Sequence, residues 1–164
     1  MFYGATGTGK TLLAAIVAQE KMKRGVSVIF VSVPDLLMDI RESFGTGKTG
    51  EILRSVQQVP CLVLDDLGAE RMSEWVAEQV FSVINYRYNH DLQTIITTNY
   101  GLKALAGRMA TAIKGKDSEG DVQSKRIISR ICEMCYIVDV SGEDFRMHGK
   151  RASDKARRIS NGGL

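Results

Sequence analysis

The sequence has few of the features that mark secreted, fibrous or membrane proteins. Its 164 residues include only 3 cysteines and 2 prolines, which excludes a disulfide-built miniprotein and a collagen. No apolar run approaches the roughly 18 to 20 residues that a membrane-spanning helix needs. The residues from Met1 to Gly4 also lack the basic start and the apolar stretch of a signal peptide. If Met1 is the natural start, these absences predict a cytoplasmic protein without a membrane segment.

The few cysteines predict reduced thiols. Cys61, Cys132 and Cys135 are an odd number, and the single C-x-x-C pair has no second pair and no close histidine at zinc-ligand spacing, so a metal site is the less favoured alternative. The remaining composition, with 44% hydrophobic and 25% charged residues, is that of an ordinary soluble protein and excludes disorder. At this length we expect one domain with a packed core.

The net charge of +3 is unevenly distributed. Residues 146–164 contain six basic residues and one acidic residue, so the preceding part of the chain carries a small negative charge. We therefore expect a core over residues 1–145 and a basic tail over 146–164. On charge alone, this tail is either a site for a polyanion or a solvated terminus.

Short β-rich runs alternate with longer helical patterns along the chain. This order is typical of the α/β class, with a mostly parallel five-stranded sheet between two layers of helices. The stretch 114–123 has two glycines and one apolar residue, Val122, and is expected to be an exposed loop. The expected strands are 1–3, 26–33, 61–64, 94–98 and 136–140, and the expected helices are 10–24, 35–44, 50–58, 73–89 and one that includes 125–131.

The strongest motif is a full match to G-x-x-x-x-G-K-[ST]. A β-like run precedes it and an amphipathic helix follows, with Leu12, Leu13, Ile16 and Val17 on one side. This arrangement directs backbone N–H groups and a positive helix end at phosphate oxygens, which a glycine-rich surface turn would not need. Lys10 would neutralise the β- and γ-phosphates of a nucleotide, and the Thr11 hydroxyl would bind Mg²⁺. The predicted nucleotide-binding residues are Gly4, Ala5, Thr6, Gly7, Thr8, Gly9, Lys10, Thr11 and Leu12.

A second glycine-rich run, at residues 45–49, is similar but lacks the first glycine of the motif. Glu42 occupies that position, and its carboxylate would repel phosphate. The residues before it are helical in pattern rather than β-like. We interpret this run as a flexible surface loop in which Lys48 could contact a nucleic-acid backbone.

Polar side chains follow two of the predicted strands, where doubly wound sheets bind ligands. Asp65 and Asp66 end the apolar run that starts at Cys61, and Asn99 ends the next β-rich run. In a phosphate-loop protein, Asp65 would bind Mg²⁺ and Asp66 would orient and deprotonate the attacking water. The amide of Asn99 can contact both the γ-phosphate and this water. The alternatives are a polar turn for the aspartates and strand-end capping for Asn99.

Two arginines, Arg126 and Arg130, lie four residues apart on one face of a predicted helix. A solvated basic face is the common explanation of such a pair. The predicted site, however, has Lys10 as its only other side-chain cation, and phosphoryl transfer usually gains an arginine at the γ-phosphate.

Together, residues 4–11, 64–70, 97–99, 126–130 and 140–146 resemble the AAA+ module of DnaC/DnaI-type replicative helicase loaders, and also the IstB-like transposition ATPases. The resemblance implies a RecA-like P-loop core without an evident lid, ATP and Mg²⁺ as cofactors, and homo-oligomers that form on ATP binding. It also implies hydrolysis at a site shared between subunits, single-stranded DNA binding, and a replicative ring helicase as partner. Arg130 matches the arginine finger that acts on a neighbour's ATP, Asn99 matches the first sensor, and Arg126 is a second candidate cation.

The sequence departs from this family at its start. Members carry a helicase-binding region before the first strand, whereas Met1 here already belongs to that strand. We therefore expect a fragment, a truncated product or a phage variant that would need the absent region to bind a helicase. An IstB-like transposition helper, a small-molecule P-loop kinase and a hydrolysis-poor ATP- and DNA-binding switch remain as alternatives.

Overall fold

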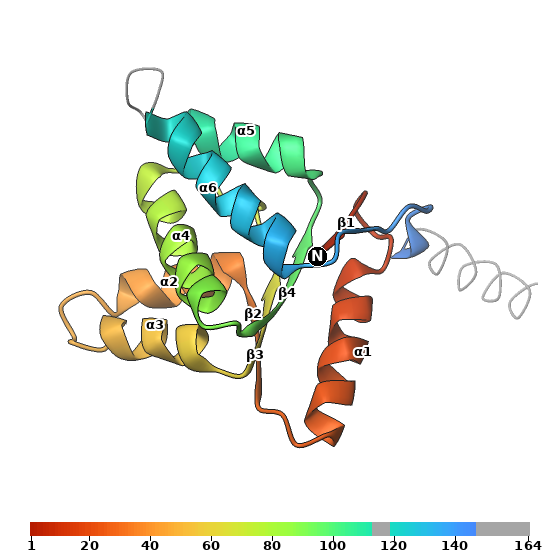
Figure 1. The fold of residues 1–164 in the computed structure, drawn as a ribbon, viewed down its shortest axis with the longest axis horizontal. Coiled ribbons are helices and arrows are strands. Elements are labelled where there is room, and N and C mark those ends of the chain that lie inside the picture. The colour runs from red at the N-terminus through yellow and green to blue at the C-terminus, as the bar shows by residue number, and fades with distance from the viewer. Residues whose placement is uncertain (113–118, 147–164) are drawn as a thin grey trace, which may run out of the picture.

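A parallel five-stranded sheet in the order β2-β3-β4-β1-β5 organises the fold (Figure 1). The computed structural model describes residues 1–112 and 119–146. Every strand pair is parallel, and β4 lies between β1 and β3, which confirms the predicted α/β class. The strands are β1 (Phe2–Tyr3), β2 (Val28–Ser32), β3 (Cys61–Asp65), β4 (Gln93–Thr98) and β5 (Val138–Asp139).

The helices agree with the predicted ones except in the last third of the chain. They are α1 (Lys10–Lys23), α2 (Val33–Glu42), α3 (Thr49–Gln58), α4 (Glu74–Asn89), α5 (Leu102–Ala112) and α6 (Glu119–Met134). The helix α5 was not predicted, although Leu102, Leu105 and Met109 recur at helical spacing and the last two are fully buried; Gly107 weakens the helical pattern. The predicted loop is wrong over residues 119–123, which begin α6, and residues 113–118 lie outside the described part. This helix start has no apolar residue before Val122, so it carries no periodic signal.

The two faces of the sheet are covered unequally. Figure 1 shows α1 alone on one side and α2 to α6 on the other. The larger core lies between the sheet and those five helices and includes Leu62, Ile96 and Ile131. On the other side, Ala14 and Ala18 of α1 pack against Val63.

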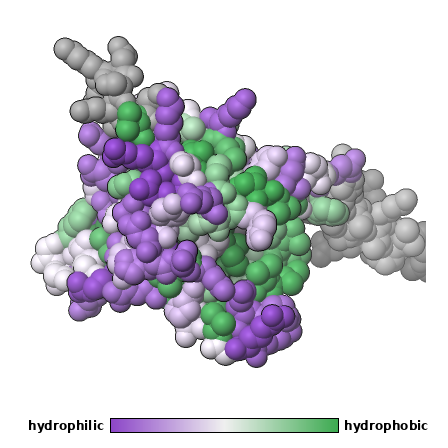
Figure 2. All heavy atoms as spheres, viewed as in Figure 1, coloured by the Kyte–Doolittle hydropathy of each residue, from purple (hydrophilic) through white to green (hydrophobic). Residues whose placement is uncertain are grey.

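The apolar side chains predicted to lie together on α1 face solvent instead of the core. Leu12 is 64% exposed and Ile16 is 48% exposed, and Leu13 and Val17 are also exposed. Figure 2 shows this region as a hydrophobic patch over α1. The helix therefore contacts the sheet through its small alanines, and its large apolar side chains remain exposed.

Serines cap the start of α2 and of α4, two helices that were predicted from the sequence. Ser32 Oγ accepts a hydrogen bond from Asp35 N at 3.2 Å at the start of α2, and Ser73 Oγ accepts one from Val76 N at 3.3 Å at the start of α4. Each such cap satisfies a backbone donor that the helix leaves unpaired. Within the described ranges, no helix has the length and hydropathy needed to cross a bilayer.

Candidate nucleotide site

The predicted phosphate loop connects β1 to α1 and is packed against the last described segment of the chain. Gly7 has φ 82°, and a Cβ there would lie 1.9 Å from Asp144 Oδ1. At Gly4, a Cβ would lie 2.4 Å from the carbonyl oxygen of Val140. Phe145 N also donates a hydrogen bond to Gly7 O at 3.1 Å. Close contact with the Val140 backbone therefore favours glycine at position 4, and the left-handed backbone together with the nearby Asp144 carboxylate favours it at position 7.

Within this loop, Lys10 is directed at a cleft of about 530 Å³. Its Nζ donates a hydrogen bond to Ala5 O at 2.6 Å. Burial lowers the pKa of the Lys10 ammonium below its ordinary value, and the carboxylates of Asp66 and Asp65 oppose this effect. The ammonium is thus close to both predicted carboxylates.

The cleft brings together most of the residues that the motifs predict. From the loop and the start of α1, Thr6, Gly7, Gly9, Lys10, Thr11 and Leu12 line it, and Asp66 and Asn99 line it from the ends of β3 and β4. Of the remaining loop residues, Thr8 is buried, and its Oγ1 donates to Ala5 O at 3.0 Å. Thr8 therefore contributes to the shape of the loop through this bond.

The two aspartates occupy different environments. Asp65 is 7% exposed and accepts a hydrogen bond from Thr97 Oγ1 at 2.5 Å. Asp66 follows with φ 56°, a left-handed conformation that is uncommon for a residue other than glycine. Its N–H donates to the same Thr97 Oγ1 at 2.9 Å. One hydroxyl of β4 therefore fixes both aspartates, a role that the sequence analysis did not assign to Thr97.

The oxygen donors near the loop fit a nucleotide with Mg²⁺. Thr11 lines the cleft, whereas Asp65 is not among its lining residues and ends β3, the strand next to β4. Hydroxyl and carboxylate oxygens are the hard ligands that Mg²⁺ prefers. The loop glycines, Lys10 and the positive end of α1 suit the phosphates.

Arg146 also lines the cleft, although the sequence analysis placed it at the start of the basic tail. Its positive charge contributes to the lowered pKa of Lys10, so the two cations are near each other. Its backbone N–H donates to Asp144 Oδ1 at 2.9 Å. The cleft therefore has a second cation from its own chain. The other tail residues, 147–164, lie outside the described part.

The predicted arginine pair of α6 does not line this cleft. The Arg130 guanidinium lies 5.5 Å from the ring centroid of Phe81 and 5.3 Å from that of Tyr88, both in α4. Its Nη1 donates to Arg126 O at 3.1 Å, and Arg126 is exposed. The arginines and the phosphate loop are thus separate within one chain. Residues 45–48 are an exposed loop between α2 and α3, as predicted.

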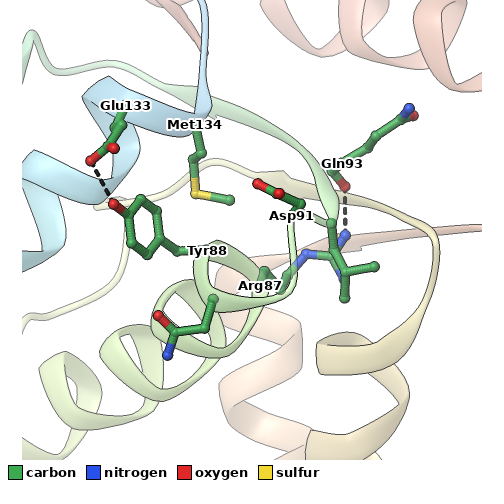
Figure 3. Close-up of a pocket in the computed structure, with 8 residues that line it drawn as sticks. Arg87, Tyr88, Asp91, Gln93, Glu133 and Met134 are labelled. Atoms are coloured by element: carbon green, nitrogen blue, oxygen red, sulfur yellow. Dashed lines mark hydrogen bonds between the residues drawn. The ribbon is translucent and has the colours of Figure 1, made fainter.

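A larger pocket of about 660 Å³ lies among the ends of α4, α6 and β4. Figure 3 shows Tyr88 directed at Glu133 and Arg87 directed at Gln93. These contacts are hydrogen bonds of 2.7 Å and 2.5 Å. Arg87 is fully buried, and burial lowers its pKa to about 10. Gln93 begins β4 and Thr98 ends it. This pocket therefore lies at the amino end of β4, whereas Asn99 and the phosphate loop lie at its carboxyl end.

The buried guanidinium of Arg87 has a structural explanation. Its Nη1 donates to the carbonyl oxygens of Val56 and Val59 at 3.0 and 2.8 Å, and its Nε donates to Thr94 Oγ1 at 2.9 Å. The side chain thereby joins the end of α3 to the start of β4 and satisfies backbone groups that burial would otherwise leave unpaired.

Comparisons with known proteins agree with a nucleotide-binding role for the cleft. Residues 1–153 match the family described as IstB-like ATP binding protein. The replicative helicase loader DnaI of Bacillus subtilis (strain 168) is 30% identical over 145 residues, which are 88% of this chain and 46% of that protein. An insertion sequence IS5376 putative ATP-binding protein of Geobacillus stearothermophilus is 27% identical over 159 residues, which are 96% of this chain and 59% of that protein.

Solved structures share the fold. A crystal structure of DnaI has a TM-score of 0.75 and 34% identity, over 85% of this chain and 71% of that one. A structure of the replication initiator DnaA bound to AMPPCP and single-stranded DNA has a TM-score of 0.68 and 27% identity, over 87% of this chain and 40% of that one. The chain spans about half the length of the curated relatives described above. It belongs to the IstB-like ATP-binding family and is an ATP-binding module with the AAA+ P-loop fold, which confirms the resemblance.

Proposed function

We propose that this chain hydrolyses ATP at a site completed by a second subunit, binds single-stranded DNA, and acts in the loading of a replicative ring helicase. The observation that carries the proposal is the meeting of Lys10 and Thr11 with Asp66 and Asn99 in one cleft. Phosphate-binding groups and water-activating groups then line one cleft, as hydrolysis of a nucleoside triphosphate requires.

Each residue of the cleft has a distinct proposed role. Lys10 and Arg146 bind the phosphates as cations, and the backbone N–H groups of the loop bind them as neutral donors. Bound Mg²⁺, held by Thr11 and Asp65, would neutralise charge on the β- and γ-phosphates. The Asp66 carboxylate accepts the proton of the attacking water. The Asn99 amide orients that water and contacts the γ-phosphate.

We assign Arg130 to the site shared between subunits, because Arg130 lies away from the cleft of its own chain. The rings of Phe81 and Tyr88 hold its guanidinium at the surface between α4 and α6. An arginine on such a surface can reach a nucleotide held by a neighbouring copy, which explains why hydrolysis would require ATP-dependent homo-oligomers. We propose residues 1–145, together with Arg146 at the cleft, as the ATPase core of each subunit.

Single-stranded DNA is proposed to bind near the loop between α2 and α3. Phe44 is 55% exposed, and its ring centroid lies 6.0 Å from that of Trp75. The Arg41 guanidinium lies 4.7 Å from the Trp75 ring, and Lys48 follows in the same exposed loop. Aromatic rings that stack with bases, next to cations that contact phosphates, are typical of sequence-tolerant single-strand binding. A structural neighbour, the replication initiator DnaA, was solved with single-stranded DNA, which supports single-stranded DNA as the class of ligand.

The partner is proposed from the names of the relatives. DnaI is a replicative helicase loader, which favours a ring helicase. A transposition helper is the second candidate, since the IS5376 relative matches 96% of this chain. Co-purification of the protein with a replicative helicase or with a transposase would decide between them.

Steady-state ATP hydrolysis, together with titration of a fluorescent ATP analogue, tests the enzymatic proposal. Asn tolerates the left-handed conformation of residue 66, so Asp66→Asn should bind the analogue but lose about 10² to 10⁴-fold in hydrolysis rate. Lys10→Ala should lose binding, and the control Lys48→Ala should retain binding and hydrolysis. Undiminished hydrolysis by Asp66→Asn would reject the cleft as the active site, and phosphate transfer to a small acceptor instead of water would favour a kinase.

A further inference from the structure

The turn after β3 is closed by its own glutamate. Gly68 N donates hydrogen bonds to Glu70 Oε2 and Oε1 at 3.1 and 3.3 Å, and Ala69 N donates to Asp66 O at 3.0 Å. Burial raises the pKa of the Glu70 carboxyl above its ordinary value, and the hydrogen bonds and the charge of Arg108 oppose the rise. The carboxylate is therefore held inside the turn that presents Asp66.

Arg108 of α5 contacts this turn and also the turn after β4. Its Nη2 approaches Glu70 O at 3.4 Å, and its Cζ lies 4.5 Å from the ring centroid of Tyr100. Tyr100 directly follows Asn99 in the sequence. Among the described residues, the buried Arg108 Nε has no hydrogen-bond partner, so the ring contact and the carbonyl contact account for its placement.

The two turns also contact each other directly. A Cβ on Gly68, which has φ 90°, would lie 3.1 Å from the Tyr100 ring. Thr98 Oγ1 donates to Leu67 O at 2.6 Å, and Leu67 N donates to Thr97 O at 2.9 Å. The turn that carries Asp66 therefore cannot shift without displacing the turn that carries Asn99.

We propose that Glu70, Arg108 and Tyr100 form a clamp that fixes Asp66 relative to Asn99, and that they are positioning residues for ATP hydrolysis. This inference rests on the proposed function. None of the three lines the cleft, so their effect on hydrolysis passes through the two turns. The left-handed backbone of Asp66 supports the need for a clamp, because such a conformation persists only where the surroundings hold it.

The test compares the rate constant for hydrolysis with affinity for a fluorescent ATP analogue, using the full chain and checking each variant by thermal unfolding. Glu70→Ala and Arg108→Ala should lower kcat by about 10 to 10²-fold, since small misplacements of catalytic groups have effects of this size. Their affinity for the analogue should stay that of the wild type. Glu70→Gln keeps an acceptor for Gly68 N, and Tyr100→Phe keeps the ring, so both should retain wild-type kcat.

Arg71→Ala is the matched control for Arg108→Ala, because Arg71 is an exposed arginine next to the same turn and should leave kcat unchanged. Wild-type kcat in both Glu70→Ala and Arg108→Ala would overturn the clamp. The clamp would also be overturned if the alanine variants lost analogue affinity and thermal stability together with kcat and Glu70→Gln did not restore them. That result would show a general folding role. Failure of the proposed function is a different result, in which the wild-type chain itself shows no hydrolysis.

Discussion

Removing the Arg130 guanidinium should affect hydrolysis far more than folding. In the folded chain this group lies over the rings of Phe81 and Tyr88, and cation–π contacts at exposed sites contribute roughly 0.5 to 1 kcal/mol each. Arg130→Ala should therefore lower the free energy of unfolding by about 1 to 2 kcal/mol. An arginine finger contributes on the order of 10³ to 10⁵ in rate, or roughly 4 to 7 kcal/mol.

These two magnitudes separate a catalytic role from a packing role. Denaturant unfolding measures the loss of packing stability, and single-turnover hydrolysis at saturating ATP measures the loss of rate. Arg130→Ala should bind the ATP analogue normally, because Arg130 does not line the cleft of its own chain. Arg71→Ala is the control, since this exposed arginine outside α6 should change unfolding by no more than about 0.5 kcal/mol and hydrolysis only slightly.

Mixing two inactive proteins provides the decisive measurement. Asp66→Asn lacks the proposed base but still carries Arg130, whereas Arg130→Ala has an intact cleft. A mixed oligomer therefore contains some sites with both groups, and activity should return on mixing. If oligomers form under the same conditions and no activity returns, Arg130 is not part of a shared site, and its position over Phe81 and Tyr88 reflects helix packing alone.

Three further predictions use other parts of the structure. Arg146→Ala should weaken affinity for the ATP analogue by about tenfold or more, because a charge-assisted hydrogen bond contributes roughly 1.5 to 3 kcal/mol, and an unchanged Kd would place this side chain outside the phosphate site. Thr97→Val removes the hydroxyl that contacts both aspartates, so it should lower kcat and reduce the free energy of unfolding by about 1 to 3 kcal/mol; wild-type kcat would contradict the role given to Thr97. Single-stranded DNA affinity should fall with salt at a slope of about −0.7 per phosphate neutralised, and Lys48→Ala and deletion of residues 150–164 should each flatten the slope, whereas an unchanged slope would leave these groups as solvated charges.

The sequence predicted the parts of the site that are local in the chain. The phosphate loop is one continuous motif, and Asp65, Asp66 and Asn99 each end a run of β-rich residues. The strand order was not needed to expect these three residues at the same end of the sheet, because parallel strands present their carboxyl ends together. The structure places Asp66 and Asn99 in the same cleft as Lys10. Their proposed chemistry remains a prediction.

The parts that were missed depend on contacts between distant segments. Arg146 enters the cleft because residues 140–145 pack against Gly4 and Gly7, and charge counting alone assigned it to a tail. Thr97 acts through a hydrogen bond to another strand. On α1, helical periodicity located the apolar side, but only the sheet shows that Ala14 and Ala18 form the contact. Close packing of a helix on a sheet favours the smaller side chains here, which the hydrophobic pattern does not predict.

The strand order explains how the cleft could influence the surface proposed to face a neighbour. Because β4 lies between β1 and β3, a displacement of Asn99 acts on both walls of the cleft. Tyr100 continues from β4 and contacts Arg108 of α5, and α5 packs against α6, the helix of Arg130. Contiguity of this kind is not evidence of coupling by itself. A double-mutant cycle on hydrolysis, combining Arg108→Ala with Arg130→Ala, measures the coupling: additive losses would mean that the clamp and Arg130 act independently, and a smaller combined loss would mean that they act on the same step.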